Sequence, residues 1–343
     1  MKKKLFLVSV VVLVTILATI GCTSQPAQQQ EQRIEFIGSA LGSNNYVDMA
    51  GLGQLLASKH PWLRLDVIEG PGLTGVTFAM MTRAEEDGYT TKRIGGTCDP
   101  DYYMAANAMG PFDEKFPNIR DVDRVLGSYG WFLVKIYTLD PNIKTEKDLA
   151  GKRLAAGQPG QTGWGLLPNF YLKEIAKVDV QVDFMTPTAA TEAMLDGKAD
   201  AAVLNTALST DFATVVMPAP YQQLAAAGKT PYWVSWSDDL VNTAESQGYT
   251  PLLLPVTVPA NSLPSQPTSI TVSAYHCNIT AHKDFPEDLA YEFTKFWLEN
   301  SAALVDYAAP AQIISKPQDI ASDFTQDQVH PGAWKAYKEL GLR

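Results

Sequence analysis

The sequence has few of the residue types that build metal sites and nucleophilic catalytic centres. Its 343 residues include three cysteines and four histidines. The histidines are His60, His276, His282 and His330, and none has a Cys, Asp or Glu cluster at metal-ligand spacing. Cys98 has no histidine placed with it, and no G-x-S-x-G motif occurs. We therefore expect no metal, no cofactor and no catalytic residue, which disfavours an enzyme.

Positive charge is also in short supply. The chain has 27 Lys and Arg residues against 37 Asp and Glu residues, for a formal net charge of −10. An acidic chain is a poor match for nucleic acid, so we expect no nucleic-acid partner. An anionic small molecule stays compatible with this charge, because backbone dipoles can make a pocket locally positive.

Long apolar runs are missing beyond the N-terminus. Lys2–Lys4 precede an uncharged apolar run, Leu5–Ile20, which is about as long as a signal-peptide core and short for a membrane span. Gly21 and Cys22 follow, and then a polar, Gln-rich stretch. This pattern resembles a bacterial lipoprotein signal, except that Thr19 stands where Leu is usual. An uncleaved anchor is the alternative.

The N-terminal pattern predicts a signal peptide over residues 1–21, lipidation of Cys22 and a flexible tether over residues 22–33. Both readings place the body of the protein outside the cytoplasm, anchored to a membrane in the periplasm or on the outer cell surface. With no second run of ~18 apolar residues, we expect that body to be soluble. An oxidising compartment allows a disulfide between Cys98 and Cys277, but we expect two buried free thiols.

Strand and helix patterns alternate twice along the chain, which predicts an α/β fold. "RIEFIG", "LRLDVIEG" and "TTKRIGGT" read as strands separated by helical patterns, an order typical of a parallel sheet covered by helices. The same pattern returns after residue 144. Two β-rich stretches, residues 124–139 and 263–281, fit crossings between two lobes. We assign residues 34–128 and 268–343 to lobe 1 and residues 129–267 to lobe 2, enclosing a cleft that closes about a hinge.

A glycine-rich loop, "AAGQPGQTGWG", lies between the strand "KRLAA" and the helix "WGLLPNFYLKEI". It lacks the G-K-[ST] ending and the lysine of a phosphate-binding P-loop, and it is not G-x-G-x-x-G. A nucleotide is not expected outside the cell. The N–H groups of Gly160, Gln161, Thr162 and Gly163 suit a carboxylate at a helix N-terminus. A tight structural turn is the alternative.

Other candidate ligand-binding residues gather at the same expected sheet edge, because ligands of such sheets bind at the carboxyl ends of the strands. The loop "GSALGSNN" offers short donors, although Asn44 or Asn45 alternatively caps its own helix. Trp164 is either a core residue or a ring that stacks on a ligand. The candidates outside the glycine-rich loop are Ser39, Gly42, Ser43, Asn44, Thr74, Thr97, Tyr129, Trp164 and Asn205.

The segment "DLAGKRLAAGQPGQTG" resembles the second-lobe motif of TAXI-type solute receptors of tripartite ATP-independent periplasmic (TRAP) transporters. Matching segments are "FIGSALGSNNYVDMAGLGQLL", "FPNIRDVDRVLGSY", "AMLDGKADAAV", "DFPEDLAYEFTKFWLEN" and "VHPGAWKAYKELG", in the family's order and over nearly the whole mature chain. The resemblance implies a two-lobed, periplasmic-binding-protein-like (type II-like) fold, with a mainly parallel sheet flanked by helices in each lobe and two β crossings. It also implies a receptor that delivers a small organic acid, such as glutamate, glutamine or a dicarboxylate, to membrane transporter subunits.

Carried over by motif, the ligand contacts implied are Ser39, Gly42, Ser43 and Asn44 in the first lobe and residues 160–163 in the second. The family's S-G-T is Q-T-G here, and Trp164 stands where an acidic residue often follows, which favours a bulkier or less polar acid. The segment "PGLTGVTFAMMTRAEEDGYT" is more similar to receptors of tripartite tricarboxylate transporters. A sensor lipoprotein without a transport role and a secreted enzyme are the remaining alternatives.

Overall fold

The computed structural model describes residues 31–41, 43–208, 215–322 and 324–343. The chain divides into two units, Met1–Glu31 and Gln32–Arg343, and the second contains the elements described below. The expected signal peptide, the lipidation site Cys22 and most of the tether lie outside the described residues. Among the helices of the described part, none is both long and apolar enough to cross a membrane.

The first part of the sheet is a parallel βαβαβ unit. Strand β1 (Gln32–Ile37) lies between β2 (Leu63–Ile68) and β3 (Arg93–Cys98) and pairs with both in parallel. Helices α2 (Asn44–Lys59) and α3 (Leu73–Thr82) make the connections and bury their apolar residues against the sheet. The strands follow the predicted patterns closely, and Gly38, Pro61 and Gly70 lie within two residues of the ends of β1, α2 and β2.

The second part of the sheet repeats this arrangement. Strands β7 (Ala201–Leu208), β5 (Arg153–Ala156) and β6 (Gln181–Phe184) are parallel neighbours. Helix α7 (Pro187–Leu195) starts with Pro187 and is capped by the Thr186 hydroxyl. The expected helix after the glycine-rich loop is a continuous helical segment, in which π-helical turns (Thr162–Leu166 and Tyr171–Ile175) flank α6 (Leu167–Phe170).

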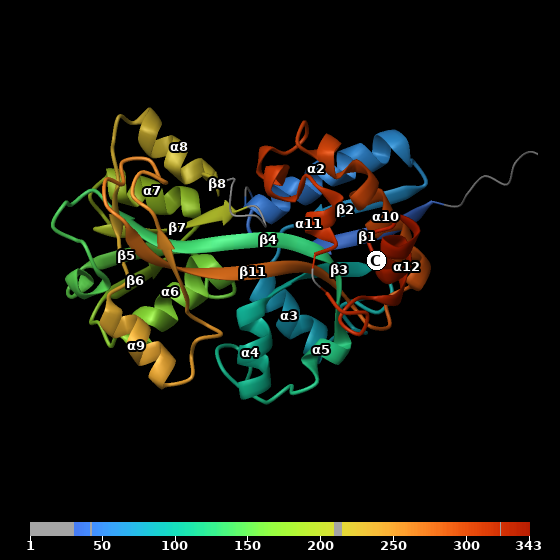
Figure 1. Cartoon of the computed structure of the whole chain (residues 1–343), viewed down its shortest axis with the longest axis horizontal. Helices are drawn as coiled ribbons and strands as arrows, with labels where there is room; N and C mark the ends of the chain where they lie inside the picture. Colours follow the sequence, from blue (N-terminus) through green and yellow to red (C-terminus); the bar gives the residue numbers. More distant parts are fainter. Residues whose placement is uncertain (1–30, 42, 209–214, 323) are drawn as a thin grey trace, which may run out of the picture. The chain divides into compact units, whose positions relative to one another are not determined.

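Two long strands join the two parts of the sheet (Figure 1). Strand β4 (Asp123–Thr138) and strand β11 (Ile270–His282) are antiparallel to each other; β11 also pairs with β3, and β4 with β7. The order along the sheet is β2-β1-β3-β11-β4-β7-β5-β6. The expected α/β, two-lobed, periplasmic-binding-protein-like fold with two β crossings is thus confirmed. The lobe boundaries stay a prediction, since both crossing strands run continuously through the junction.

The remaining elements cover the sheet or extend its edges. Helices α10 and α12 pack on the first lobe, where the Tyr337 hydroxyl donates to the Leu126 carbonyl at 2.8 Å. Several of the short elements below carry no strong sequence pattern, which is why the sequence did not predict them. The further elements are α4 (Asp99–Asn107), α5 (Ile119–Val122), a 3-10 turn (Glu146–Leu149), β8 (Val215–Val216), α8 (Ala219–Ala226), β9 (Tyr232–Val234), α9 (Asp238–Ser246), β10 (Leu254–Val258), α10 (Glu287–Leu304), a 3-10 segment (Ala309–Ile314), α11 (Pro317–Ile320) and α12 (Pro331–Glu339).

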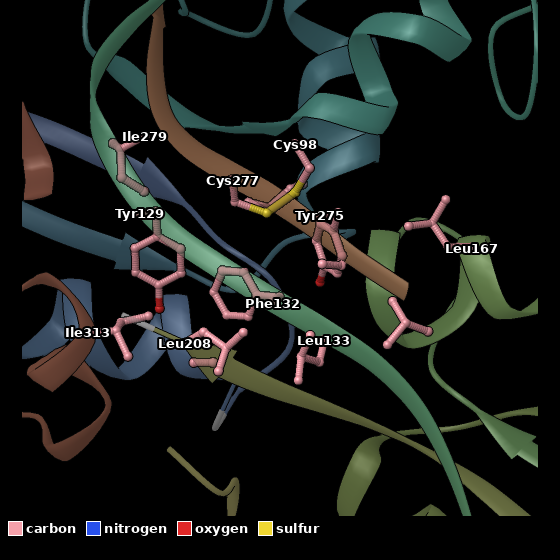
Figure 2. Packing of buried hydrophobic residues seen from close by; sticks show 14 of the residues in the cluster. Cys98, Tyr129, Phe132, Leu133, Leu167, Leu208, Tyr275, Cys277, Ile279 and Ile313 are labelled. Atoms are coloured by element: carbon pink, nitrogen blue, oxygen red, sulfur yellow. A yellow bond between two sulfur atoms is a disulfide. The ribbon is translucent and has the colours of Figure 1, made fainter. Parts of the chain in front are cut away.

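Cys98 and Cys277 form a disulfide, so the expectation of two free thiols was wrong. The two residues are 179 positions apart in the sequence, but the β3–β11 register places them directly opposite each other, with Cα atoms 4.0 Å apart. Figure 2 shows the bond among buried side chains of the crossing strands, including Tyr129, Phe132 and Tyr275. A bond that closes so long a loop typically stabilises a fold by about 2–5 kcal/mol.

Lys135 is fully buried in β4. Its ammonium donates to the Thr206 hydroxyl and lies 5.5 Å from the ring centre of Trp233. Burial holds the pKa of Lys135 well below its usual range. Below the ordinary lysine pKa the unfolded chain therefore binds more protons at this residue than the folded chain, and the free energy of unfolding rises as the pH increases toward that value.

We expect Lys135→Met to raise the free energy of unfolding at pH 7 by about 1–4 kcal/mol, because an apolar side chain of similar length removes the cost of the buried amine. Urea denaturation at pH 7 and at pH 10 measures the free energy of unfolding. Its increase between these two pH values should be smaller in the variant than in the wild type. The exposed Lys229→Met serves as the control and should leave both values unchanged. Lower stability of Lys135→Met at pH 7 would contradict this account.

Candidate functional site

A small cavity of about 50 Å³ lies where the two lobes and the two crossing strands meet. A volume of this size holds a few water-sized atoms. The first lobe contributes Ser39, Ser43, Asn44, Asn45, Leu73 and Cys98; the crossing strands contribute Tyr129, Phe132, Tyr275 and Cys277; the second lobe contributes Gln161, Thr162, Gly163, Trp164 and Asn205. The cavity is therefore bounded by segments from both lobes.

The structure brings nine of the thirteen predicted ligand-binding residues to this cavity: Ser39, Ser43, Asn44, Tyr129, Gln161, Thr162, Gly163, Trp164 and Asn205. Gly42 lies outside the described residues. Thr74, Thr97 and Gly160 do not line the cavity, and each has a structural role nearby. Asn45, Leu73, Phe132, Tyr275 and the two cysteines line it without having been predicted to do so.

Gly160 lies at a close contact between the lobes. A Cβ atom on Gly160 would lie 2.3 Å from the Pro71 carbonyl oxygen, and one on Gly72 would lie 2.3 Å from the Gly160 carbonyl oxygen. Gly72 also has a φ of 101°, which side chains disfavour. The glycines therefore allow the backbones of the two lobes to touch at this point, while the ligand contact expected of Gly160 stays a prediction.

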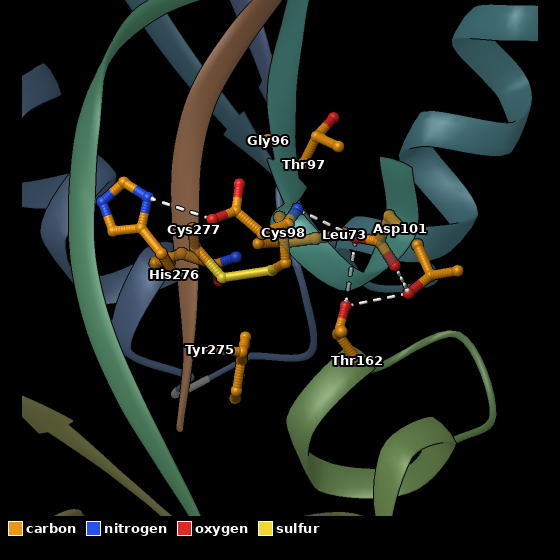
Figure 3. The surroundings of a disulfide bond; sticks show 12 residues. Leu73, Gly96, Thr97, Cys98, Asp101, Thr162, Tyr275, His276 and Cys277 are labelled. Atoms are coloured by element: carbon orange, nitrogen blue, oxygen red, sulfur yellow. Dashed lines mark hydrogen bonds and ion pairs between the residues drawn. A yellow bond between two sulfur atoms is a disulfide. The ribbon is translucent and has the colours of Figure 1, made fainter. Parts of the chain in front are cut away.

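Thr74 takes part in a buried hydrogen-bond cluster that also joins the lobes. Figure 3 shows the other two members, Asp101 and Thr162. The Thr74 hydroxyl donates to Asp101 at 2.7 Å and lies 2.8 Å from the hydroxyl of Thr162, which is itself 3.4 Å from Asp101. Burial raises the pKa of Asp101 to about 7, and these hydroxyl groups oppose that rise. A carboxyl of the first lobe is therefore in contact with two threonines, one from each lobe.

Thr97 lies inside the first lobe, where its hydroxyl donates to Asp123 and lies 2.9 Å from the hydroxyl of Thr77. It is fully buried at the sheet, so it supports the lobe and does not reach the cavity. The sequence placed Thr97 correctly at the end of β3. The alternation of side chains along the strand directs it to the other face from Cys98.

Asn45 organises the loop before α2. Its side-chain oxygen accepts from the Ser39 backbone N–H at 3.3 Å and from the Ser43 hydroxyl at 2.8 Å, and its amide donates to the Ser39 hydroxyl at 3.2 Å. The helix N-cap is Ser43, whose side chain makes no capping bond. The capping alternative for Asn44 and Asn45 is thus replaced by a network that holds two cavity-lining serines in place.

Tyr275 links the crossing strand β11 to the second lobe. Its hydroxyl accepts from the Asn205 amide at 2.5 Å and receives a hydrogen bond from the Gly163 backbone. A Cβ atom on Gly163 would lie 2.1 Å from this hydroxyl, so only glycine fits there. Tyr275 therefore uses one of the helix N–H groups that the sequence assigned to a ligand. Its spacing of two residues from Cys277, on a strand, is the signal that could have found it.

The cavity has no cationic side chain among its described lining residues. Behind Tyr129 lies Asp48, whose carboxyl accepts from the Tyr129 hydroxyl at 2.7 Å while its second oxygen is buried without a described partner. Burial raises the pKa of Asp48 to about 8, so the neutral acid is favoured at pH 7. An anion in this cavity would meet hydroxyl, amide and backbone N–H donors and the neutral form of the nearest acid.

Trp164 both lines the cavity and packs on the hydrophobic core, so the two alternatives for this ring hold together. It lies in the first π-helical turn after the glycine-rich loop, and the Trp164 carbonyl accepts from the Gly157 N–H at 2.8 Å. A π-helical turn widens a helix by one residue and often occurs at functional sites. The ring therefore narrows the cavity from the side of the second lobe.

A comparison with protein-family models matches residues 94–341 to the NMT1-like family. The chain belongs to the NMT1-like family. This match covers most of the body and includes β3, both crossing strands and the second lobe. The family is thus established at this level, while the TAXI-type assignment stays a prediction.

Solved structures with low sequence identity are also similar to the chain. MatC from Rhodopseudomonas palustris with bound malate is 11% identical, with a TM-score of 0.48, and the match covers 90% of this chain and 96% of that one. Another R. palustris protein, with adipate, is 12% identical, with a TM-score of 0.49 and coverage of 90% and 97%. The alkanesulfonate-binding protein SsuA from Xanthomonas axonopodis pv. citri, bound to MOPS, is 13% identical, with a TM-score of 0.39 and coverage of 91% and 94%.

Asp48→Asn should change how stability depends on pH. Because the pKa of Asp48 is raised to about 8, its stabilising effect is fully present below the unfolded value of 3.8 and is lost as the pH rises through the folded value. The wild type should lose on the order of a few kcal/mol of unfolding free energy between pH 4 and pH 8, and Asp48→Asn should not show this loss. The asparagine can still accept the hydrogen bond from Tyr129. Urea denaturation at both pH values measures the difference. The exposed Asp179→Asn is the control, and an unchanged pH dependence in Asp48→Asn would count against a buried neutral carboxyl.

Proposed function

We propose that the protein is an extracytoplasmic solute receptor that captures a small organic acid between its lobes and delivers it to a membrane transporter. The observation that carries this proposal is the cavity at the junction of the lobes, which both lobes and both crossing strands line. A site that both lobes complete is assembled only in the closed form, so ligand binding is coupled to closure. Membership of the NMT1-like family supports the proposal.

The chemistry of the cavity supports an acid as the ligand. The first residues of the helical segment after the glycine-rich loop, Thr162, Gly163 and Trp164, line the cavity, where the helix dipole favours negative charge, although the Gly163 N–H is already bonded to Tyr275. Hydroxyl and amide groups from Ser39, Asn44 and Asn205 lie around the same space. No nucleophile and base occur together among these lining residues, which is in accord with binding without turnover.

At a finer level, we propose a lipid anchor at Cys22 and a TAXI-type receptor of a TRAP-type secondary transporter. The motif series of the two lobes supports this choice, while residues 71–90 support the tripartite tricarboxylate receptors as the alternative. A sensor lipoprotein with the same fold is the second candidate function. A neighbouring transporter gene supports transport, and a sensor-kinase gene in that place would favour sensing.

A thermal-shift screen of monocarboxylates, dicarboxylates and amino acids tests the receptor function. A ligand that binds only the folded state raises stability by about 2.7 kcal/mol at a hundred-fold excess over Kd. We expect at least one organic acid to raise the melting temperature in a saturable way and to remain chemically unchanged on incubation. If no acid shifts the melting temperature, or if the acid that does is consumed, the proposal fails.

Gly160→Ala tests whether the site needs closure. The added Cβ would lie 2.3 Å from the Pro71 carbonyl oxygen, so we expect the variant to lose at least tenfold in affinity for the acid found in the screen, measured by calorimetry. The free energy of unfolding should change little, because the clash exists only between the lobes. Gly151→Ala, at an exposed turn with free space around it, is the control for affinity and should keep it; its φ of 72° lowers stability in the alanine variant, so only the affinity is compared. Wild-type affinity in Gly160→Ala would show that binding does not require this contact.

A further inference from the structure

A second, larger hollow lies on the other face of the crossing strands. It has a volume of about 500 Å³, within the range of small-molecule sites, and is called the aromatic groove after its lining rings. These rings, together with one guanidinium, are Tyr102, Tyr103, Trp131, Tyr275, His276 and Arg120. On β11, His276 faces the groove while Cys277 faces the cavity, and on β4 Trp131 and Phe132 divide in the same way. Figure 3 shows His276 directed away from the disulfide.

Walls from both lobes bound the aromatic groove. Helix α4 of the first lobe supplies Tyr102 and Tyr103, and the segment before β10 supplies Pro251. The Tyr103 hydroxyl donates to the Gly248 carbonyl at 2.9 Å, which ties the two walls together at one end. The groove is thus a defined hollow between packed elements and not a single exposed face.

Arg120 gives the groove an anion-binding group. Its guanidinium carbon lies 3.9 Å from the ring centre of Tyr102, a stacking that holds the planar group in place. The nearest carboxylate oxygen, on Asp99, is 4.0 Å away, beyond hydrogen-bond distance. Arg120 therefore forms a long ion pair with Asp99, and because no hydrogen bond from its guanidinium is described, its N–H groups can still donate to a ligand carboxylate.

The remaining groups restrict what the groove accepts. The rings of Trp131 and His276 lie 5.1 Å apart, and Ser128 holds the His276 ring at 2.7 Å, so flat surfaces face the hollow. Asp99 lies 3.9 Å from His276 and would repel a second negative charge on the ligand. Burial lowers the pKa of His276, which leaves Arg120 as the cation of the groove near neutral pH.

We propose that the aromatic groove is a second ligand site, separate from the cavity, which binds a planar aromatic monocarboxylic acid with its ring among Tyr103, Trp131 and His276 and its carboxylate on Arg120. The ring fills the aromatic part of the groove by stacking. The single carboxylate matches the one cation, and because Asp99 lies 4.0 Å from Arg120, a second carboxylate would add repulsion without a further cation. A site with this chemistry is independent of which solute the cavity holds.

Benzoate is the probe for this site, titrated into the purified protein by calorimetry and by tryptophan fluorescence. We expect saturable binding to the wild type, with benzamide at least about tenfold weaker because it lacks the charge that Arg120 binds. Arg120→Gln should weaken benzoate at least about tenfold, whereas Arg83→Gln, an equal charge change on an exposed arginine elsewhere, should leave it unchanged. Leu254→Trp, which places a larger ring on a 40% exposed position of the groove wall, should abolish binding.

Three results would overturn the proposal. The first is no saturable benzoate binding by the wild type up to about 10 mM. The second is equal benzoate affinity in wild type, Arg120→Gln and Leu254→Trp. The third is loss of benzoate binding in Gly160→Ala together with its retention in Arg120→Gln, because that pattern places benzoate in the cavity. Since Arg120 and Leu254 are remote from the cavity lining, this outcome is independent of whether the receptor function holds.

Discussion

The antiparallel pairing of β4 with β11 is the interaction on which the other features depend. In the part of the chain that the structure describes, these two strands extend from the first lobe into the second, and their pairing, from Ser273–Val134 to His282–Asp123, is the continuous connection between the sheet halves. The disulfide attaches β11 to β3 at the same point. The strands that join the two lobes therefore also supply Tyr129, Phe132, Tyr275 and Cys277 to the wall of the cavity.

The cavity shows how an acidic protein can offer a site for an acid. Its described lining residues include no lysine or arginine. The positive potential offered to an anion comes from helix N–H groups, hydroxyls and amides, whose dipoles act strongly where water is excluded. Burial raises the pKa of Asp48 and of Asp101, which lowers the negative charge close to the site. A net charge of −10 is therefore a property of the surface and does not describe the site.

The sequence predicted the features that depend on local patterns. Periodicity and the Gly and Pro signals located the long strands and helices, and the rule that ligands bind at strand ends brought nine predicted residues to one cavity. The sequence did not predict the features that depend on the register between distant segments. The disulfide needs Cys98 opposite Cys277, and the role of Tyr275 needs β11 beside β7 and the glycine-rich loop. The close contact of Gly160 with Pro71 was likewise not predicted, because a loop rich in glycine shows that a backbone approaches something, but not what it approaches.

Because one pair of strands carries both hollows, the two sites are mechanically linked. Tyr275 lines both, and strand alternation assigns Cys277 to one and His276 to the other. If the lobes close about these strands, as the proposed function requires, opening the contact of Gly72 with Gly160 also moves the two walls of the aromatic groove relative to each other. The Tyr103–Gly248 hydrogen bond spans those walls and so belongs to the closed arrangement. A molecule that binds more tightly to one width of the aromatic groove therefore stabilises the open or the closed arrangement of the cavity that goes with that width, by thermodynamic linkage.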